Sequence, residues 1–140
     1  TTGYSKHRRE HVSLVFQDHN LIDYLTPEEN LRLVNPKADM KILEDLGLSR
    51  EESKRNIMHL SGGQRQRVAV GRALVAPGRA ILADEPTGSL DPEMTDEVID
   101  LLRHAAHQLG KCVIVVTHSK RVADSADAVY TLRHKKLAKA

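Results

Sequence analysis

The spacing of hydrophobic and polar residues along the chain changes between strand-like and helix-like patterns. Apolar, partly β-branched residues alternate with polar ones over 11–16, which predicts a strand that ends at Gln17. Unbroken apolar runs at 80–83 and 112–116 predict two strands buried on both faces, the second reaching Thr117, and 128–132 is expected to form a last strand. Because helical stretches separate these strands, the pattern predicts an α/β fold with a parallel sheet.

Capping signals predict where the helices begin. Thr-Pro-Glu-Glu at 26–29 and Ser-Arg-Glu-Glu at 49–52 are capping boxes, in which the first and last side chains satisfy each other's backbone N–H groups. Residues 1–19 and 76–140 are therefore expected to form the sheet core of one domain, and about 20–75 a small helical subdomain. Helices are predicted from Pro27 to Val34, from Lys37 to Leu46 with Gly47 as the stop, from Gly62 to Val75, from Pro92 to Leu109, and from Arg121 to Asp127.

Composition fits one globular domain of 140 residues, 40% of them apolar. With one Phe and no Trp, the core must consist of Leu, Val, Ile and Ala. The net charge of +2 is too small to indicate nucleic-acid binding. No apolar run reaches the ~20 residues of a membrane helix, so a link to a membrane is expected to run through a partner. Cys112, the only cysteine, lies in an apolar run and is expected to be a buried core side chain.

The strongest chemical motif is Leu-Ser-Gly-Gly-Gln at 60–64. Ser61, Gly62 and Gly63 stand at the start of a predicted helix, where backbone N–H groups are free at the positive end of the helix dipole. Because the glycines have no side chains, a phosphate can approach these groups closely. Taken alone, the three residues also fit a simple turn before a helix.

Polar residues also follow the two apolar strands. Asp84 and Glu85 come after the first, at the carboxyl end where α/β sheets bind ligands. One acid there can hold Mg²⁺ through water, and the other can take a proton from an attacking water. His118 follows the second strand and can donate to a phosphate. Taken alone, two acids after an apolar run often arise by chance, and most of the eight histidines are expected on the surface.

The order of these motifs resembles that of the ATP-binding cassette (ABC) ATPases. Residues 60–74 resemble the ABC signature motif, 80–85 a Walker B motif and 86–91 a D-loop. Gln17 matches the Q-loop glutamine of that family, and His118 its switch histidine. The resemblance covers essentially the whole chain and is strongest to the branch that serves lipoprotein release, macrolide export and bacteriocin export.

This resemblance implies a P-loop NTPase-like ABC fold, incomplete at its amino end, and an ATPase that drives a transporter with ATP and Mg²⁺. Two such subunits would pair head to tail, with each ATP held between the two chains. The implied partners are a second ATPase subunit and a transmembrane permease at the inner face of the cell membrane, without nucleic acid. The implied catalytic residues are Glu85, His118 and Gln17, the nucleotide contacts are Ser61, Gly62, Gly63, Gln64 and Asp91, and the metal residues are Asp84 and Gln17.

The family's P-loop, Gly-x-x-x-x-Gly-Lys-Ser/Thr, does not occur in the 140 residues. The one Gly-Lys pair, at 110–111, is followed by Cys and has Ala105 where the first Gly would stand. In the family fold, the strand before the P-loop lies between those matching 112–117 and 128–132. We therefore expect one of three outcomes: the sheet closes over the gap, another chain donates a strand, or 128–132 leaves the sheet.

Two other classes of protein compete with a motor ATPase. A truncated or degenerate cassette that only binds a partner would also lack a P-loop, although the intact Glu85, His118 and signature favour catalysis. A chromosome-maintenance or DNA-repair ATPase also carries a Ser-Gly-Gly signature. That class has long heptad coils, which this sequence lacks.

Overall fold

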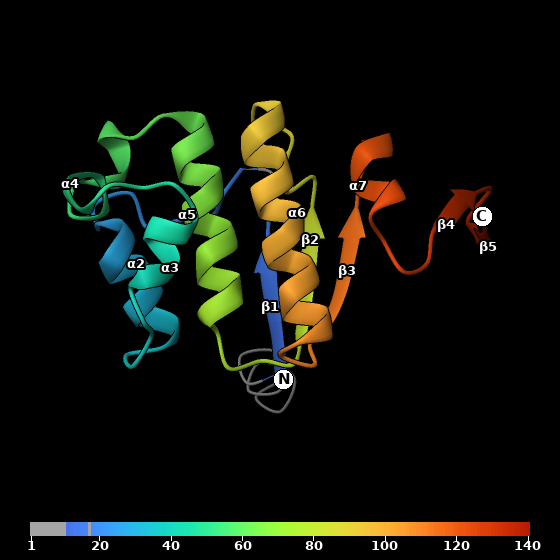
Figure 1. Cartoon of the computed structure of the whole chain (residues 1–140), viewed down its shortest axis with the longest axis horizontal. Helices are drawn as coiled ribbons and strands as arrows, with labels where there is room; N and C mark the ends of the chain where they lie inside the picture. Colours follow the sequence, from blue (N-terminus) through green and yellow to red (C-terminus); the bar gives the residue numbers. More distant parts are fainter. Residues whose placement is uncertain (1–10, 17) are drawn as a thin grey trace.

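Three parallel strands form the main sheet in the computed structural model, which describes residues 11–16 and 18–140 (Figure 1). The strands are β1 (Val12–Val15), β2 (Ala80–Asp84) and β3 (Cys112–Val116), in the order β1–β2–β3. Each pair is in parallel register, although long helical segments separate the strands in sequence. The predicted α/β class and parallel sheet are confirmed.

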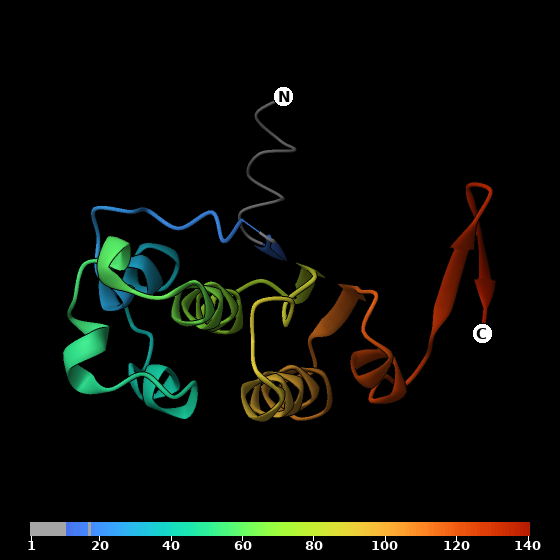
Figure 2. The ribbon, with the colours of Figure 1, turned by 90° about the horizontal axis from the view of Figure 1, so that it is seen from above.

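Helices lie beside this sheet in two groups. Viewed from above, α5 (Gly62–Val75) and α6 (Pro92–His107) lie on one face of the sheet (Figure 2). The short helices α2 (Pro27–Val34), α3 (Lys41–Asp45) and α4 (Arg50–Ser53) extend outward past α5. None of the helices in the described part of the chain is long and apolar enough to cross a membrane. A 3₁₀ turn (Ile57–His59) precedes α5, and the short helix α7 (Lys120–Asp124) follows β3.

The hydrophobic core joins the two groups of helices to the sheet. Fully buried side chains come from residues 20–60, here called the helical insert (Leu31 and Leu43), from α5 (Val68), from β2 (Ile81) and from α6 (Val98). Every buried member of this cluster is Leu, Val, Ile or Ala, as the scarcity of aromatic residues predicts. Burial of such side chains contributes about 25 cal/mol per Å² of apolar surface, which makes this cluster the main stabilising contact.

The other face of the sheet is open over the described residues. Leu82 is 37% exposed, Ile114 52% and Val116 62%, and the thiol-bearing Cys112 is exposed as well. The prediction that these two strands are buried on both faces, with Cys112 in the core, is therefore wrong. Alternate residues of a strand point to opposite faces, and the helices that the structure describes pack against the face that carries Ile81.

The capping boxes form as predicted. The hydroxyl of Thr26 accepts from the N–H of Glu29 at 3.2 Å, and the carboxylate of Glu29 accepts from the N–H of Thr26 at 2.8 Å. Ser49 and Glu52 exchange the same two bonds at 3.1 and 2.8 Å. Each box satisfies two backbone donors that a helix start otherwise leaves unpaired.

The helix predicted over 37–46 is shorter than expected, since α3 begins only at Lys41. The side chain of Asn35 accepts from the N–H of Lys37 at 3.1 Å, and that of Asp39 accepts from the N–H of Lys41 at 3.0 Å. Such local bonds from side chain to backbone compete with helical hydrogen bonds. They hold the preceding residues in turns.

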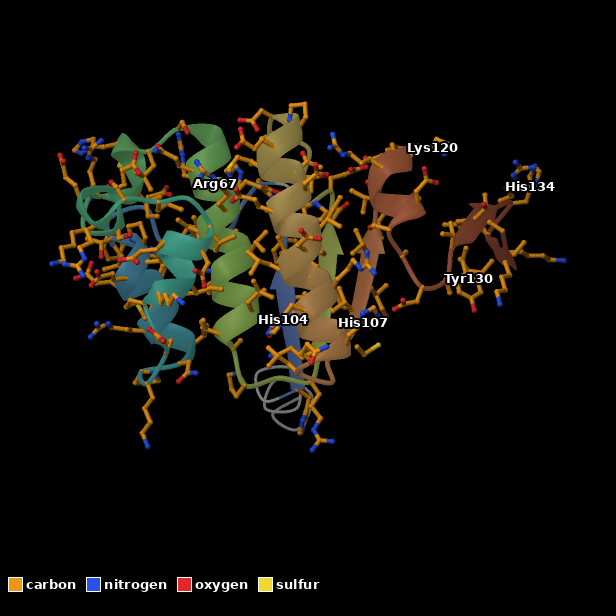
Figure 3. All side chains as sticks on the ribbon, viewed as in Figure 1. Arg67, His104, His107, Lys120, Tyr130 and His134 are labelled. Atoms are coloured by element: carbon orange, nitrogen blue, oxygen red, sulfur yellow. The ribbon has the colours of Figure 1, made fainter. Side chains whose placement is uncertain are left out.

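Arg67 ties α5 to the turn that ends α3 (Figure 3). Its Nη1 donates to the carbonyl oxygens of Leu46 at 2.8 Å and Gly47 at 3.1 Å. Gly47 has a φ of 73°, which is the left-handed conformation of a glycine helix stop. The helical insert is therefore fixed to α5 by polar bonds as well as by its core.

A separate hairpin ends the chain. β4 (Tyr130–Arg133) pairs antiparallel with β5 (Lys136–Lys139) and does not join the main sheet; Figure 3 labels Tyr130 and His134 on it. The strand predicted over 128–132 thus leaves the sheet, which is the third expected outcome. The strand β5 was not predicted, because its turn carries no glycine signal: His134 and Lys135 take φ values of 49° and 62°, which hairpins usually assign to Asn-Gly.

Gly78 lies where the chain leaving α5 passes the start of β1. A Cβ at this position would lie 2.8 Å from the carbonyl carbon of His11, a backbone atom that cannot move aside alone. We expect Gly78→Ala to lower the free energy of unfolding by about 1–3 kcal/mol, the usual cost of overpacking. Urea denaturation checks this, with Gly62→Ala as the control because its Cβ meets nothing within 4 Å. Equal losses in both variants would contradict the packing argument.

Candidate functional site

The carboxylate of Glu85, just after β2, is held by residues that follow β3. Its Oε2 accepts from the hydroxyl of Thr117 at 3.1 Å, and its Oε1 accepts from the backbone N–H of His118 at 2.8 Å. The hydroxyl oxygen of Thr117 in turn accepts from the N–H of Ser119 at 2.9 Å. The Glu85 side chain keeps 18% of its surface exposed. The carboxylate is therefore oriented and still open to water.

The backbone of Glu85 adopts a conformation that residues with a side chain seldom take. Its φ is 47°, in the left-handed region. The N–H donates to the carbonyl of Val116 at 2.8 Å, and the carbonyl accepts from the N–H of Gly88 at 3.2 Å, so the turn after β2 is fixed on both sides. Strained backbone of this kind concentrates at functional sites, where a particular side chain is required.

The other predicted residues at this edge are exposed. The ring of His118 is fully open to solvent, with Nε2 4.0 Å from Oε1 of Glu85. Asp84 is exposed at the end of β2. Gln17 lies outside the described residues. The structure thus brings Asp84, Glu85 and His118 to the carboxyl end of the sheet, as predicted.

The signature residues form the amino end of α5. The hydroxyl of Ser61 accepts from the N–H of Gln64 at 3.1 Å, and the amide oxygen of Gln64 accepts from the N–H of Ser61 at 2.8 Å. Ser61 and Gly62 are exposed, and no atom lies within 4 Å of a Cβ built on Gly62. Figure 1 shows this end of α5 on the same side of the molecule as the carboxyl ends of β1, β2 and β3.

The D-loop packs against the signature within the same chain. A Cβ on Gly63 would lie 3.3 Å from the carbonyl oxygen of Ser89. The buried side-chain amide of Gln66 donates to the carbonyl of Pro86 at 2.8 Å. Asp91 caps α6 by accepting from the N–H of Met94 at 2.9 Å. The helix that carries the signature is thus bonded to the segment that follows Glu85.

The contact made by Gln66 was not predicted from the sequence, although a signal was present. This residue lies three and four positions before Ala69 and Val70, which face the core. A glutamine on the buried face of a helix needs a polar partner, and the nearest segment able to supply one is the turn after β2.

Lys111, of the Gly-Lys pair without a P-loop pattern, has a structural role. Its Nζ donates to the carbonyl oxygens of Ala76 at 2.7 Å and Gly78 at 2.8 Å, beyond the end of α5. Burial lowers the pKa of this amine. Since its hydrogen bonds go to the protein backbone, this lysine satisfies carbonyl groups at a helix end.

The two signature glycines have different surroundings, which predicts different effects of the same substitution. We expect Gly63→Ala to shift the D-loop, because the new methyl group presses on the carbonyl of Ser89. Gly62→Ala, with open space around it, should leave the D-loop and the unfolding temperature unchanged. Crystal structures of the two variants check this. An unmoved D-loop in Gly63→Ala would contradict it.

The parallel sheet, the capped Ser-Gly-Gly start of α5 and the Glu held just after β2 are together the arrangement expected of an ATP-binding cassette. The family model for the ABC transporter domain matches residues 2–88. The chain belongs to this family.

Relatives and solved structures agree with this assignment. The chain is 36% identical over 135 residues to the ABC transporter ATP-binding protein YclH of Bacillus subtilis, covering 89% of this chain and 60% of the relative. It is 41% identical over 138 residues to the lipoprotein-releasing system ATP-binding protein LolD of Rickettsia prowazekii, covering 91% and 62%. It is 39% identical to the macrolide export ATP-binding/permease protein MacB of Escherichia coli K12, covering 90% and 21%. The predicted resemblance to the lipoprotein-release and macrolide-export branch agrees with these relatives.

The fold matches a solved cassette of the same family. A dimer of the ATP-binding cassette MJ0796 in a post-hydrolysis state, bound to ADP and Pi, superposes with a TM-score of 0.86 at 32% identity, covering 99% of this chain and 66% of the other. The chain spans about three-fifths of the length of YclH and LolD.

Proposed function

We propose that this chain is part of a motor ATPase that binds and hydrolyses ATP to drive an ABC transporter. The observation that carries the proposal is the Glu85 carboxylate, which is held at the carboxyl end of β2 by Thr117 and His118 and remains open to water. On this proposal the chain is a partial ABC domain. Residues of about 20–75 form its helical subdomain, and 1–19 with 76–140 belong to its sheet core.

Each residue at the sheet edge has a proposed role. Glu85 takes a proton from the water that attacks the γ-phosphate, because its carboxylate is fixed and accessible. His118 donates to that phosphate from its exposed ring. Gln17 assists at the metal or the water, as the family pattern implies.

Mg²⁺ is proposed to bind beside Asp84. Within the described residues, no three His, Cys, Asp or Glu side chains come together as a metal site. A single exposed carboxylate at this edge still fits Mg²⁺, which keeps several waters and takes most of its protein-site ligands from nucleotide phosphates. The metal would neutralise charge on those phosphates.

The signature is proposed to act on the nucleotide of a second subunit. Ser61 and Gly62 are exposed, which leaves the hydroxyl of Ser61 and the backbone N–H of Gly62 available to another chain. The dimeric MJ0796 cassette supports such a pairing. A transmembrane permease is the proposed partner that anchors the ATPase at the inner face of the cell membrane, since MacB joins an ATP-binding part to a permease.

The test is phosphate release from ATP by the protein expressed from its complete reading frame. We expect Mg²⁺-dependent turnover that rises when the permease is present. Tight ATP binding without any turnover, with or without the permease, would contradict a motor ATPase and favour a module that only binds a partner.

A further inference from the structure

Two capping boxes, one at α4 in the helical insert and one at the start of α5, are joined to each other through their side chains. In the first, Oε2 of Glu52 accepts from the N–H of Ser49 at 2.8 Å. In the second, Oε1 of Gln64 accepts from the N–H of Ser61 at 2.8 Å. The remaining ends of the two side chains meet, since Nε2 of Gln64 donates to Oε1 of Glu52 at 2.6 Å. A continuous series of hydrogen bonds thus runs from α4 to the signature.

The donors and acceptors in this series of hydrogen bonds can be arranged in one way. Both ends are backbone N–H groups, which only donate. A carboxylate only accepts, so the NH₂ group of Gln64 must face Glu52 and its oxygen must face Ser61. The hydrogen bond from the backbone N–H of Ser49 lowers the pKa of Glu52, and this effect exceeds the rise in pKa that burial causes. The carboxylate is therefore ionised at neutral pH.

Glu52 fixes the side chain of Gln64, which holds the backbone N–H of Ser61, and the backbone N–H of Gln64 separately holds the Ser61 hydroxyl. Its oxygen accepts from the N–H of Gln64 at 3.1 Å, which directs the hydroxyl hydrogen elsewhere. Ser61 is exposed, so the direction left for that hydrogen is toward solvent, where the proposed neighbouring nucleotide would lie.

We propose that Glu52 is a positioning residue for the signature, which orients Gln64 so that Ser61 presents its hydroxyl as a donor to the γ-phosphate of the partner subunit's ATP. This inference rests on the proposed function. It gives α4 a role in catalysis although Glu52 itself touches no nucleotide.

The experiment exchanges the carboxylate and the amide in the protein expressed from its complete reading frame. Gln64→Glu places two carboxylates against each other, and we expect ATP turnover to fall about tenfold. Glu52→Gln together with Gln64→Glu restores every donor–acceptor pair, because Gln and Glu both serve at the third position of a capping box. The double variant should turn over ATP several-fold faster than Gln64→Glu alone.

Two measurements separate positioning from stability. The unfolding temperature should differ by only a few degrees among the variants, and ATP affinity of the separated subunits should not change. Glu51→Gln is the matched control, since Glu51 lies on the same helix and pairs with Arg55 at 2.9 Å on the outside; it should leave turnover unchanged.

The possible failures are distinguishable. If the parent turns over ATP but the double variant is as slow as Gln64→Glu, Glu52 does not position the signature. If turnover follows the unfolding temperature through all variants, the bond only stabilises the fold, and the inference is wrong. A parent that does not hydrolyse ATP overturns the proposed function, and the inference with it.

Discussion

Glu85→Gln, in the protein expressed from its complete reading frame, is expected to lower ATP turnover a hundredfold or more while ATP still binds. The amide oxygen can accept from the N–H of His118, and the new NH₂ group can donate to the hydroxyl of Thr117, so the bonds that orient this side chain remain. The amide cannot take a proton from water, and a general base contributes about 10²–10⁴-fold to a rate. Steady-state phosphate release and calorimetric ATP binding measure the two effects.

A matched control removes an exposed carboxylate of another element. Asp100→Asn, at an exposed position of α6, should leave turnover unchanged. Retained hydrolysis in Glu85→Gln, within a few-fold of the parent, would show that another group takes the proton.

Ser61→Arg is expected to abolish ATP-driven dimerisation. The side chain of Ser61 is exposed beside the open Gly62, so an arginine would fill the space proposed for the partner's γ-phosphate. The test is size-exclusion chromatography with ATP and Mg²⁺ in the Glu85→Gln background, where nucleotide is not consumed.

Loss of the cap at Ser61 also costs about 1 kcal/mol of stability, so the unfolding temperature must be measured beside dimerisation. Ser61→Thr keeps the hydroxyl and serves as the control, which should still dimerise. A dimer peak that survives Ser61→Arg would count against an ATP site shared by two chains.

Local signals in the sequence predicted local structure well. The caps at Thr26, Ser49 and Ser61 depend on bonds between residues three positions apart, which the chain carries with it wherever it folds. The same holds for Asp91 at the start of α6. The order of the family motifs also predicted which segments form the site, and the structure places Glu85 beside the end of β3 as that order implies.

Features that depend on distant segments were harder to predict. The apolar run around Cys112 indicates a strand, but its burial depends on what packs against each face, and the described residues cover only one. The bond from Gln64 to Glu52 joins residues twelve positions apart, and that from Gln66 to Pro86 joins residues twenty apart. Neither pairing follows from a period of two or 3.6 residues.

The parallel pairing of β1 with β2 sets an order for folding. Val12 lies beside Ala80, so the whole helical insert and α5 must form a compact loop before this pair can close. Closing a long loop costs entropy before any strand contact repays it, whereas capped helices form within microseconds. We therefore expect the segment from Thr26 to Val75 to gain structure first, and the strands that align Glu85 to assemble late and slowly.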